Sequence, residues 1–396
     1  MRPEQIIFII LMVLLGVSAC ATPVTPIEKA PDPLNWQQYY STQGVPVVPV
    51  LNEHNVYALS ETQRKRFLTW FEAPAQQHLL PHKRLAAYLE NTLHGFSFSG
   101  STHTAQEAAR EAEGNCLSLA ILTAAYARLA NLEIKFQAVN SPPLYKKYGD
   151  LMLISSHVRT KILKPAVKDD STSENTLKIS QGGIIIDYFP QFDNVTGGDV
   201  SGNGVTAMFY RNHVAQALIE SRYAEAFWLA DKALTLAPDD PENIAAMALT
   251  LRRLGRGEEA DKLYQRSVEA GINNVTLLSN YGKHLQITGK YAQADEIDKL
   301  ILDNEDDNPY AWVVLGHERL AAKQPRRAEA LFKKALRLAP YLDDIYMGLA
   351  SSYFLQGKRL LAEEALTRAY ELAWDEKSKL QYEKKLSVLE TFQLKL

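Results

Sequence analysis

Residues 308–340 read NPYAWVVLGHERLAAKQPRRAEALFKKALRLAP, and one small residue within this stretch recurs at a constant interval along the chain. The recurring residue is alanine, at positions that follow one another every 34 residues: Ala226, Ala260, Ala294, Ala328 and Ala362. A period of this length is typical of repeat proteins, in which each unit packs only against its neighbours. The C-terminal half of the chain is therefore predicted to be an all-helical solenoid.

Other positions of the repeat are also small or suited to a turn. Twelve residues before each alanine stand Val214, Ala248, Gly282, Gly316 and Ala350. Five residues before each alanine stand Ser221, Gly255, Gly289, Lys323 and Gly357. Small side chains allow two helices to approach closely, and glycine favours the backbone conformation that ends a helix. Each unit is therefore expected to be a helical hairpin whose turn lies just before the alanine.

The opening stretch resembles a tetratricopeptide repeat, which is a helix–turn–helix unit. The matching residues are Trp312, Leu315, Gly316, Ala328, Phe332, Ala335 and Pro340. We expect units at residues 207–240, 241–274, 275–308, 309–342 and 343–376, with a capping helix at 377–396 that completes the region 207–396. The first unit departs from the pattern, because His213 and Val214 stand where leucine and glycine are usual.

The resemblance implies a concave groove that binds a protein partner and needs no chemistry of its own. The side chains expected to line this groove, from the first helix of each unit, are Arg252, Lys283, Tyr310, His317, Met347 and Phe354. An ordinary position on the surface of a helix is the alternative for each of them, and it is the more common one.

The composition excludes several classes of protein. The chain has 396 residues, of which 46% are hydrophobic and 22% charged, so it is long enough for two or three domains with sizeable cores. The net charge of −3 argues against binding to nucleic-acid phosphates. Two cysteines exclude a disulfide-rich scaffold, and the nine histidines do not cluster at ligand spacing. We therefore expect no metal, no cofactor and no nucleic acid.

The N-terminus has the features of an export signal. A basic residue is followed by an apolar run at residues 6–17, which is too short for a comfortable transmembrane helix. The sequence Val-Ser-Ala-Cys at residues 17–20 resembles the lipobox of bacterial lipoproteins. The resemblance implies that residues 1–19 are removed, that Cys20 is acylated, and that Ala21 directs the protein to the periplasmic face of the outer membrane. The alternative is a short membrane anchor that stays attached.

Residues 20–55 are predicted to be a tether between the lipid and the folded body. Six prolines fall within residues 21–50, and such a stretch favours extended conformations over helix. A proline-rich ligand for a partner is the alternative, but no motif repeats within the stretch.

The region 56–200 contains a cysteine in a position that suits a nucleophile. Helices are expected after the capping residues Ser60 and Thr104, and a third apolar helix of some 14 residues begins at Cys116. A helix N-terminus lowers the pKa of a thiol, and its free N–H groups can stabilise an oxyanion. If Cys20 is lipidated, Cys116 is the sole thiol of the mature chain. An inert cysteine packed under the helix is the alternative.

Three apolar runs after this helix are predicted to be strands, at residues 134–139, 151–163 and 183–188. The second run contains His157, and the third carries Asp187 near its end. A cysteine, a histidine and an aspartate on successive elements are the parts of a nucleophile, base and orienting acid. Taken singly, a satisfied strand histidine and an aspartate at a turn are the simpler interpretations.

These motifs resemble the transglutaminase-like superfamily over roughly residues 60–195. The matching motifs are Thr104-Ala105, residues 114–120 (GNCLSLA), Ala127-Arg128, residues 156–158 (SHV) and residues 186–189 (IDYF). The resemblance implies that the fold is an α+β papain- or transglutaminase-like domain, with Cys116 as nucleophile, His157 as base and Asp187 as the acid that orients the imidazole. Asp193 is the alternative acid. A polar insert at about residues 165–182 departs from the family pattern.

Two functions from different classes remain in competition. The first is a lipid-anchored envelope enzyme, a peptidase-like amide hydrolase or acyl transferase, whose repeats recruit a protein partner. The second is a non-catalytic adaptor, in which the repeats bind an envelope protein and the catalytic fold only supports them. The presence of all three triad residues favours the enzyme.

Overall fold

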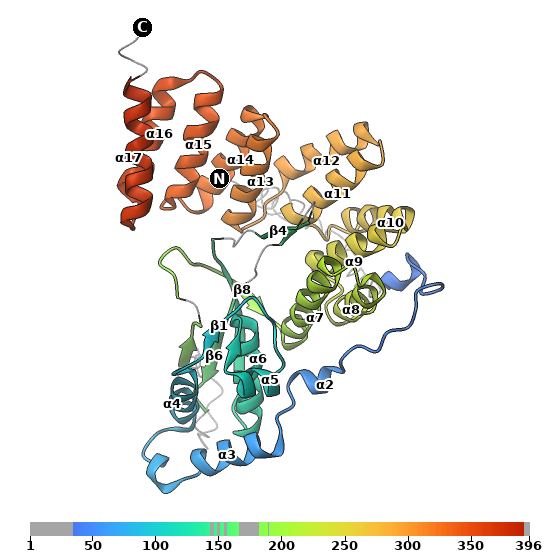
Figure 1. The fold of residues 1–396 in the computed structure, drawn as a ribbon, viewed down its shortest axis with the longest axis vertical. Coiled ribbons are helices and arrows are strands. Elements are labelled where there is room, and N and C mark those ends of the chain that lie inside the picture. Colours follow the sequence, from blue (N-terminus) through green and yellow to red (C-terminus); the bar gives the residue numbers. More distant parts are fainter. Residues whose placement is uncertain are drawn as a thin grey trace, which may run out of the picture. The chain divides into compact units, whose positions relative to one another are not determined.

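The computed structural model describes residues 35–142, 146–148, 151–153, 157–165, 182–188 and 190–391 (Figure 1). The predicted signal at residues 1–19, the predicted lipidation at Cys20 and nearly all of the polar insert lie outside the described residues. The described residues from Trp36 onward belong to one compact unit. None of the helices among them is both long enough and apolar enough to cross a membrane.

The first part of this unit is a mixed α/β domain, and four of its five described helices begin at a side-chain cap. Its helices are α2 (Glu53–Val56), α3 (Glu61–Phe71), α4 (Pro81–Leu93), α5 (Ala105–Glu111) and α6 (Cys116–Leu129). The side chains of Ser60 and Thr104 accept hydrogen bonds from backbone amides of the first turns of α3 and α5, as their sequence predicts. Every side chain of α6 from Cys116 to Ala127 is buried, so this helix is the centre of the domain.

An aromatic cluster joins α6 to the two helices before it. Phe67 of α3, Tyr88 of α4 and Tyr126 of α6 pack with ring centroids 4.8–5.1 Å apart. Rings at this separation stabilise a core beyond the area that they bury. The cluster therefore fixes α6 against α3 and α4.

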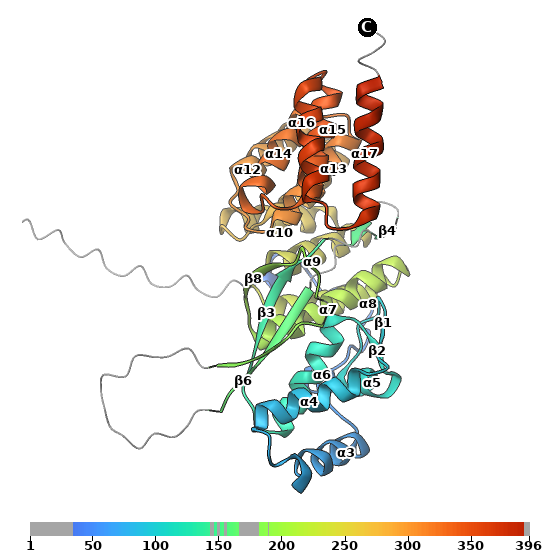
Figure 2. The same ribbon diagram turned by 90° about the vertical axis from the view of Figure 1, so that its left-hand side faces the viewer.

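The sheet beside α6 has four antiparallel strands in the order β7-β6-β3-β8. Their bounds are β3 (Ile134–Asn140), β6 (His157–Leu163), β7 (Gly183–Ile186) and β8 (Val195–Val200). Helices α4 and α6 pack against it (Figure 2). Two short two-stranded sheets complete the described strands: β1 (Ser97–Phe98) with β2 (Glu113–Gly114), and β4 (Lys146–Tyr148) with β5 (Leu151–Leu153).

The predicted strand at residues 151–163 is wrong as a single element. Its first part is β5, which pairs with β4, and its second part is β6, which pairs with β3 and β7. Backbone pairing separates the two parts, since each finds its partners in a different sheet. The strand that carries the catalytic candidate therefore begins at His157 itself.

Residues 202–391 form the predicted tetratricopeptide solenoid, and this fold is confirmed. Ten helices build five hairpins within the described residues: α7 (Gly202–Ile219) with α8 (Tyr223–Leu236), α9 (Pro241–Arg253) with α10 (Gly257–Glu269), α11 (Val275–Ile287) with α12 (Tyr291–Asp303), α13 (Pro309–Ala321) with α14 (Pro325–Leu338), and α15 (Asp343–Leu355) with α16 (Arg359–Leu372). Helix α17 (Glu376–Thr391) follows the last hairpin. The first helix begins at Gly202, ahead of the expected residue 207.

The turn inside each hairpin is the same structure five times among the described residues. The residue five before each repeat alanine has a positive φ, between 59° and 77°: Ser221, Gly255, Gly289, Lys323 and Gly357. The next residue donates its backbone N–H to the carbonyl five positions earlier, as Gln324 does to Arg319 at 2.8 Å. This is the Schellman arrangement that ends a helix. The repeat alanines themselves are almost completely buried where the two helices meet.

From Trp36 onward, the segment that precedes the α/β domain is bonded to the repeats. Trp36 donates a hydrogen bond from its indole to the carbonyl of Pro238, and Tyr40 donates its hydroxyl hydrogen to Asp231 on α8. Arg256, which caps α10, donates to the carbonyls of Ser41 and Gln43. The described part of the predicted tether at residues 20–55 is therefore bonded to the repeats.

Candidate functional site

The candidate nucleophile, Cys116, stands at the first helical position of α6. Asn115 caps this helix: its side chain accepts a hydrogen bond from the amide of Ser118 at 3.0 Å, and the Ser118 hydroxyl accepts one from the amide of Asn115. This reciprocal cap satisfies two amide groups and fixes the first turn. Cys116 is only 8% exposed, so its sulfur lies beneath the surface.

Burial dominates the electrostatics of the Cys116 thiol. Burial raises the pKa of this thiol, and the nearby Asp187 carboxylate raises it further, while backbone amides, that of Val158 first among them, act in the opposite direction. Burial outweighs the amides of Leu117 and Cys116 in the first turn, which lower the thiol pKa as the helix N-terminus predicts, so the net direction of the pKa is upward. The thiol is therefore neutral at rest unless a base removes its proton.

The candidate base, His157, lies on the strand β6, which packs against this helix. The backbone amide of Val158 reaches the Cys116 sulfur, and the residue before Val158 is His157, the first residue of β6. His157 donates from Nε2 to Oδ1 of Asp187 at 2.9 Å. A carboxylate only accepts, so this bond leaves Nδ1 of His157 as the nitrogen with a free lone pair. The histidine is 6% exposed and the aspartate side chain 21%.

Asp187, and not Asp193, is the acid that faces His157. Asp187 follows β7 directly, and β7 pairs with β6 in antiparallel register, Thr160 opposite Ile186. Asp193 lies further along the connection to β8, where its backbone carbonyl accepts a hydrogen bond from Tyr310. The structure thus joins Asp187 to His157, and it places the amide of the next residue, Val158, at the Cys116 sulfur.

Tyr188 was not singled out by the sequence, yet it joins the three elements of this site. Its hydroxyl lies 2.7 Å from Oγ1 of Thr123 on α6 and 2.9 Å from Oγ1 of Thr160 on β6. Tyr188 is buried, and this burial raises the pKa of its phenol, so it stays neutral. The available signal was a tyrosine beside the acid, together with two threonines on otherwise apolar elements. Its bonds hold the loop of Asp187 against both neighbours.

The residue before the cap has to be glycine. Gly114 has φ of +150°, and a Cβ placed on it would lie 2.7 Å from Cβ of Ser118. A larger residue there would displace Ser118, whose hydroxyl accepts the amide of Asn115 in the cap of α6. Local packing thus explains the glycine of the Gly-Asn-Cys motif.

The six side chains that were expected to line the repeat groove have different environments. Lys283 pairs with Glu318 at 2.8 Å, and His317 lies 3.5 Å from Asp344. Lys385 of α17 approaches the sulfur of Met347 at 3.4 Å. The first two contacts join the first helices of successive repeats, and the third joins the first helix of the last repeat to α17. Lys283, His317 and Met347 therefore share one side of the solenoid.

The remaining three groove candidates differ in how far their side chains are exposed. Tyr310 is only 5% exposed and is engaged with Asp193 of the α/β domain, so it is not an open surface position. Phe354 is 54% exposed near the end of α15. Arg252 is half-buried on α9.

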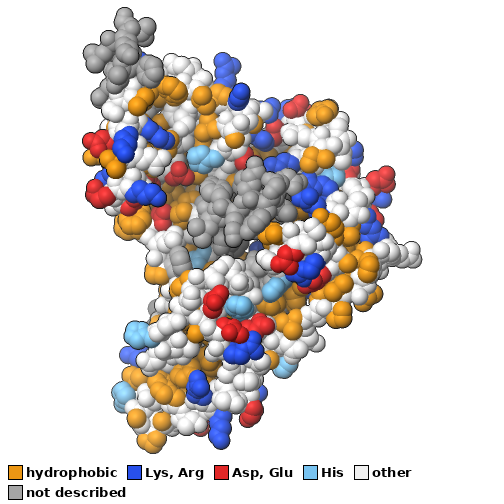
Figure 3. Space-filling view, in the orientation of Figure 1, with side chains coloured by type: hydrophobic (Ala, Val, Ile, Leu, Met, Phe, Trp, Pro, Cys, Tyr) orange, Lys and Arg blue, Asp and Glu red, His pale blue; other side chains and the backbone are white. Residues whose placement is uncertain are grey.

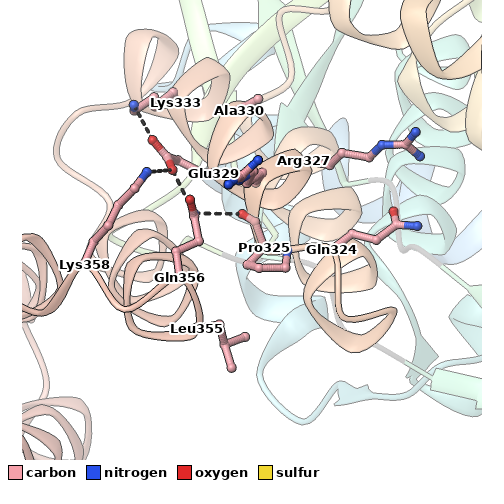
Figure 4. Close-up of a pocket in the computed structure, with 10 residues that line it drawn as sticks. Gln324, Pro325, Arg327, Glu329, Ala330, Lys333, Leu355, Gln356 and Lys358 are labelled. Carbon is pink, nitrogen blue, oxygen red and sulfur yellow. Dashed lines mark hydrogen bonds and ion pairs between the residues drawn. The ribbon is translucent and has the colours of Figure 1, made fainter.

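An open cavity of about 1040 Å³ lies on the repeats, on the side of the turns and second helices (Figure 4). Glu329 accepts hydrogen bonds there from Lys333, Lys358 and Gln356. Although partial burial opposes it, this set of donors lowers the pKa of Glu329 to about 2. The polar groups labelled in this cavity bond largely to one another, so they stabilise the junction between α14 and the turn after α15.

Charges of both signs are mixed over the repeats. Figure 3 shows lysine and arginine side chains interspersed with aspartate and glutamate on the face that it draws. No group of three or more histidine, cysteine, aspartate or glutamate residues among the described residues is arranged to hold a metal ion.

No protein-family model matches the chain, and no curated protein does. Similar solved structures are YrrB, described as a TPR protein with an unusual peptide-binding site, at 18% identity over 45% of this chain and 92% of YrrB, with a TM-score of 0.29; yeast Tom70, at 17% over 47% of this chain and 40% of Tom70, with a TM-score of 0.37; and Pseudomonas aeruginosa PilF, at 20% over 50% of this chain and all of PilF (100%), with a TM-score of 0.28. At these identities a likeness concerns the fold alone. The helical hairpins and their period within this chain carry the repeat assignment.

Proposed function

We propose that the chain is a cysteine-dependent amide hydrolase or acyl transferase of the transglutaminase-like type, with Cys116 as nucleophile, His157 as base and Asp187 as the orienting acid. The observation that carries the proposal is the hydrogen bond of 2.9 Å between His157 and Asp187. The backbone amide of the residue after His157, Val158, reaches the Cys116 sulfur. Asp187 fixes the imidazole tautomer and leaves Nδ1 to act as base.

Because the pKa of the thiol is raised, the first step of the reaction has to include removal of the thiol proton. Because the thiol is neutral at rest, Nδ1 of His157 takes its proton as the sulfur attacks the carbonyl carbon of an amide. The C–N bond then breaks, and the imidazolium returns the proton to the leaving amine. Water or a second amine attacks the thioester, and its proton passes through His157 back to the sulfur. The amides of Cys116 and Leu117, which lie at the sulfur, can stabilise the oxyanion in both halves.

The test uses the full mature chain and a mixture of unstructured peptides as substrate. Mass spectrometry of the products should reveal cleavage or amine-dependent linkage, and Cys116→Ala should abolish it. Asp187→Asn should reduce the rate by about 10⁴-fold, as the equivalent change does in serine proteases, because the wrong tautomer is favoured. Turnover that survives in Cys116→Ala would end the proposal.

The burial of Cys116 favours a second candidate function. A thiol that is 8% exposed and has a raised pKa is also what an idle catalytic fold would retain. In that case the protein is an adaptor whose repeats bind a protein or peptide of the cell envelope. Wild-type protein that turns over no peptide, yet captures an envelope protein as well as Cys116→Ala does, would support this function.

The location belongs to the same proposal. A lipidated Cys20 would anchor the protein to the outer membrane on its periplasmic face, with the residues before Trp36 as tether. The support is the Val-Ser-Ala-Cys sequence after a short apolar run. Two or more acyl chains are enough for stable anchoring.

A further inference from the structure

Among the described residues, two of the contacts between the repeats and the α/β domain reach the segments that carry the candidate triad. The first contact is on the nucleophile side. Asn115 donates from Nδ2 to Oγ1 of Thr102 at 2.7 Å, and Asn212 of α7 donates to the same oxygen at 2.9 Å. A hydroxyl oxygen has two lone pairs, so Thr102 can accept both bonds at once.

With this contact, both polar atoms of the Asn115 side chain, which caps α6, are held by hydrogen bonds. The oxygen of the Asn115 side chain accepts from Ser118 inside α6, while its nitrogen is bonded through Thr102 to Asn212 in the first repeat. Asn115 immediately precedes Cys116, so a rotation of this side chain would move the first turn that carries the sulfur. The first repeat thus contributes to where the nucleophile lies.

The second contact is on the acid side. Tyr310 of α13, in the fourth repeat, donates its hydroxyl hydrogen to the backbone carbonyl of Asp193 at 2.7 Å. Asp193 is in the connection that begins with Asp187 and ends at β8. Tyr188 holds this connection at the near end. The hydroxyl of Tyr310 holds it at the far end.

We propose that Asn212 and Tyr310 are positioning residues, through which the repeats hold the Cys116 cap and the Asp187 loop in the arrangement that catalysis requires. This inference rests on the proposed function. It assigns to the solenoid a part in the reaction itself, besides any binding of a partner. Neither residue touches the reacting atoms, so both act through a neighbour: Asn212 through Thr102 and Asn115, and Tyr310 through the carbonyl of Asp193.

The experiment removes single polar atoms from each contact in the full mature chain. Thr102→Val deletes the hydroxyl that links Asn115 to Asn212, and Thr102→Ser keeps it and serves as the rescue. Tyr310→Phe deletes the donor to Asp193. Tyr346→Phe is its matched control, because the Tyr346 hydroxyl also donates to a backbone carbonyl, that of Pro340, but within the repeats.

We expect Thr102→Val and Tyr310→Phe each to lower kcat for peptide turnover by about tenfold, with KM nearly unchanged, since a displacement of about 1 Å can cost up to roughly 10²-fold. Thr102→Ser and Tyr346→Phe should keep wild-type kcat. A uniform loss of stability would lower activity in the control as well, so the control separates positioning from folding.

A second readout decides the inference even if the proposed function fails. The rate of alkylation of Cys116 by iodoacetamide needs no substrate, and it should rise at least about threefold in Thr102→Val, because a loosened first turn exposes the buried sulfur. If the wild type turns over peptides but Thr102→Val and Tyr310→Phe keep its kcat, the positioning role is wrong and the proposed function stands. If no turnover is found in the wild type, the proposed function fails, and an unchanged alkylation rate in Thr102→Val then overturns the positioning of the sulfur as well.

Discussion

Replacing Lys323 with glycine should stabilise the solenoid. Lys323 has φ of 59°, in the left-handed region, at the position where three other repeats have glycine. A residue with a Cβ costs about 1–2 kcal/mol there, whereas glycine loses about 0.5–1 kcal/mol more backbone entropy on folding. The difference predicts a gain of about 0.5–1 kcal/mol for Lys323→Gly. At about 2–4 °C per kcal/mol for a region of this size, Tm should rise by about 1–4 °C.

Thermal melting of the full mature chain, followed by circular dichroism at 222 nm, measures this change. Lys323→Ala is the control, because it removes the long side chain but keeps the Cβ, so it should not stabilise. Gly289→Ala is the reverse experiment: its φ of 75° makes a Cβ unfavourable, and Tm should fall. If Lys323→Gly lowers Tm, or if Lys323→Ala raises it as much as glycine does, the backbone explanation is refuted.

Three further predictions follow from the site, the cavity and the N-terminus. Gly114→Ala should destabilise the protein by at least about 1 kcal/mol, because its Cβ would lie 2.7 Å from that of Ser118, whereas Gly198→Ala, with open space around it, should be neutral in the same urea titration. Glu329 has a pKa lowered to about 2, so its contribution to stability is present above its unfolded value of 4.5 and is lost as pH falls from there towards 2; Glu329→Gln should flatten the melting temperature over this window. Cys20→Ser should release the protein from the membrane fraction in immunoblots of cells that express the full chain, and continued membrane attachment would contradict lipidation.

Elements defined by local interactions were predictable from the sequence. At Ser60 and Thr104, the capping side chain accepts a hydrogen bond from the backbone amide three residues later, so each cap needs only groups that are close in the sequence. The turns of the repeats are equally local, so the period of glycines and alanines placed them correctly. The first helix of the solenoid was the exception, because its N-terminal turn at Gly202 follows β8 and not another repeat.

The strands were less predictable, because a strand is defined by its partners. The apolar run at residues 151–163 has the composition of one strand, but its two parts pair in different sheets. β8 contains two glycines and few apolar residues, so its sequence has no strong strand pattern, and its pairing with β3 is what defines it.

The candidate site divides in the same way. The identities of Cys116, His157 and Asp187 could be proposed from short motifs, because the order of residue types along the chain carries that information. The direction of the Cys116 pKa could not, since it depends on how deeply α6 is buried by elements distant in the sequence.

The sequence alone was therefore sufficient for the helix caps and the repeat turns, which depend on residues a few positions apart, and for the period of 34 residues at which those turns recur. Packing between distant segments placed Asp187 rather than Asp193 against His157, buried Cys116, and bonded Tyr310, an expected groove residue, to the carbonyl of Asp193. These are outcomes of long-range contacts, whose free energies are decided by burial and by the geometry of the assembled elements rather than by any local pattern.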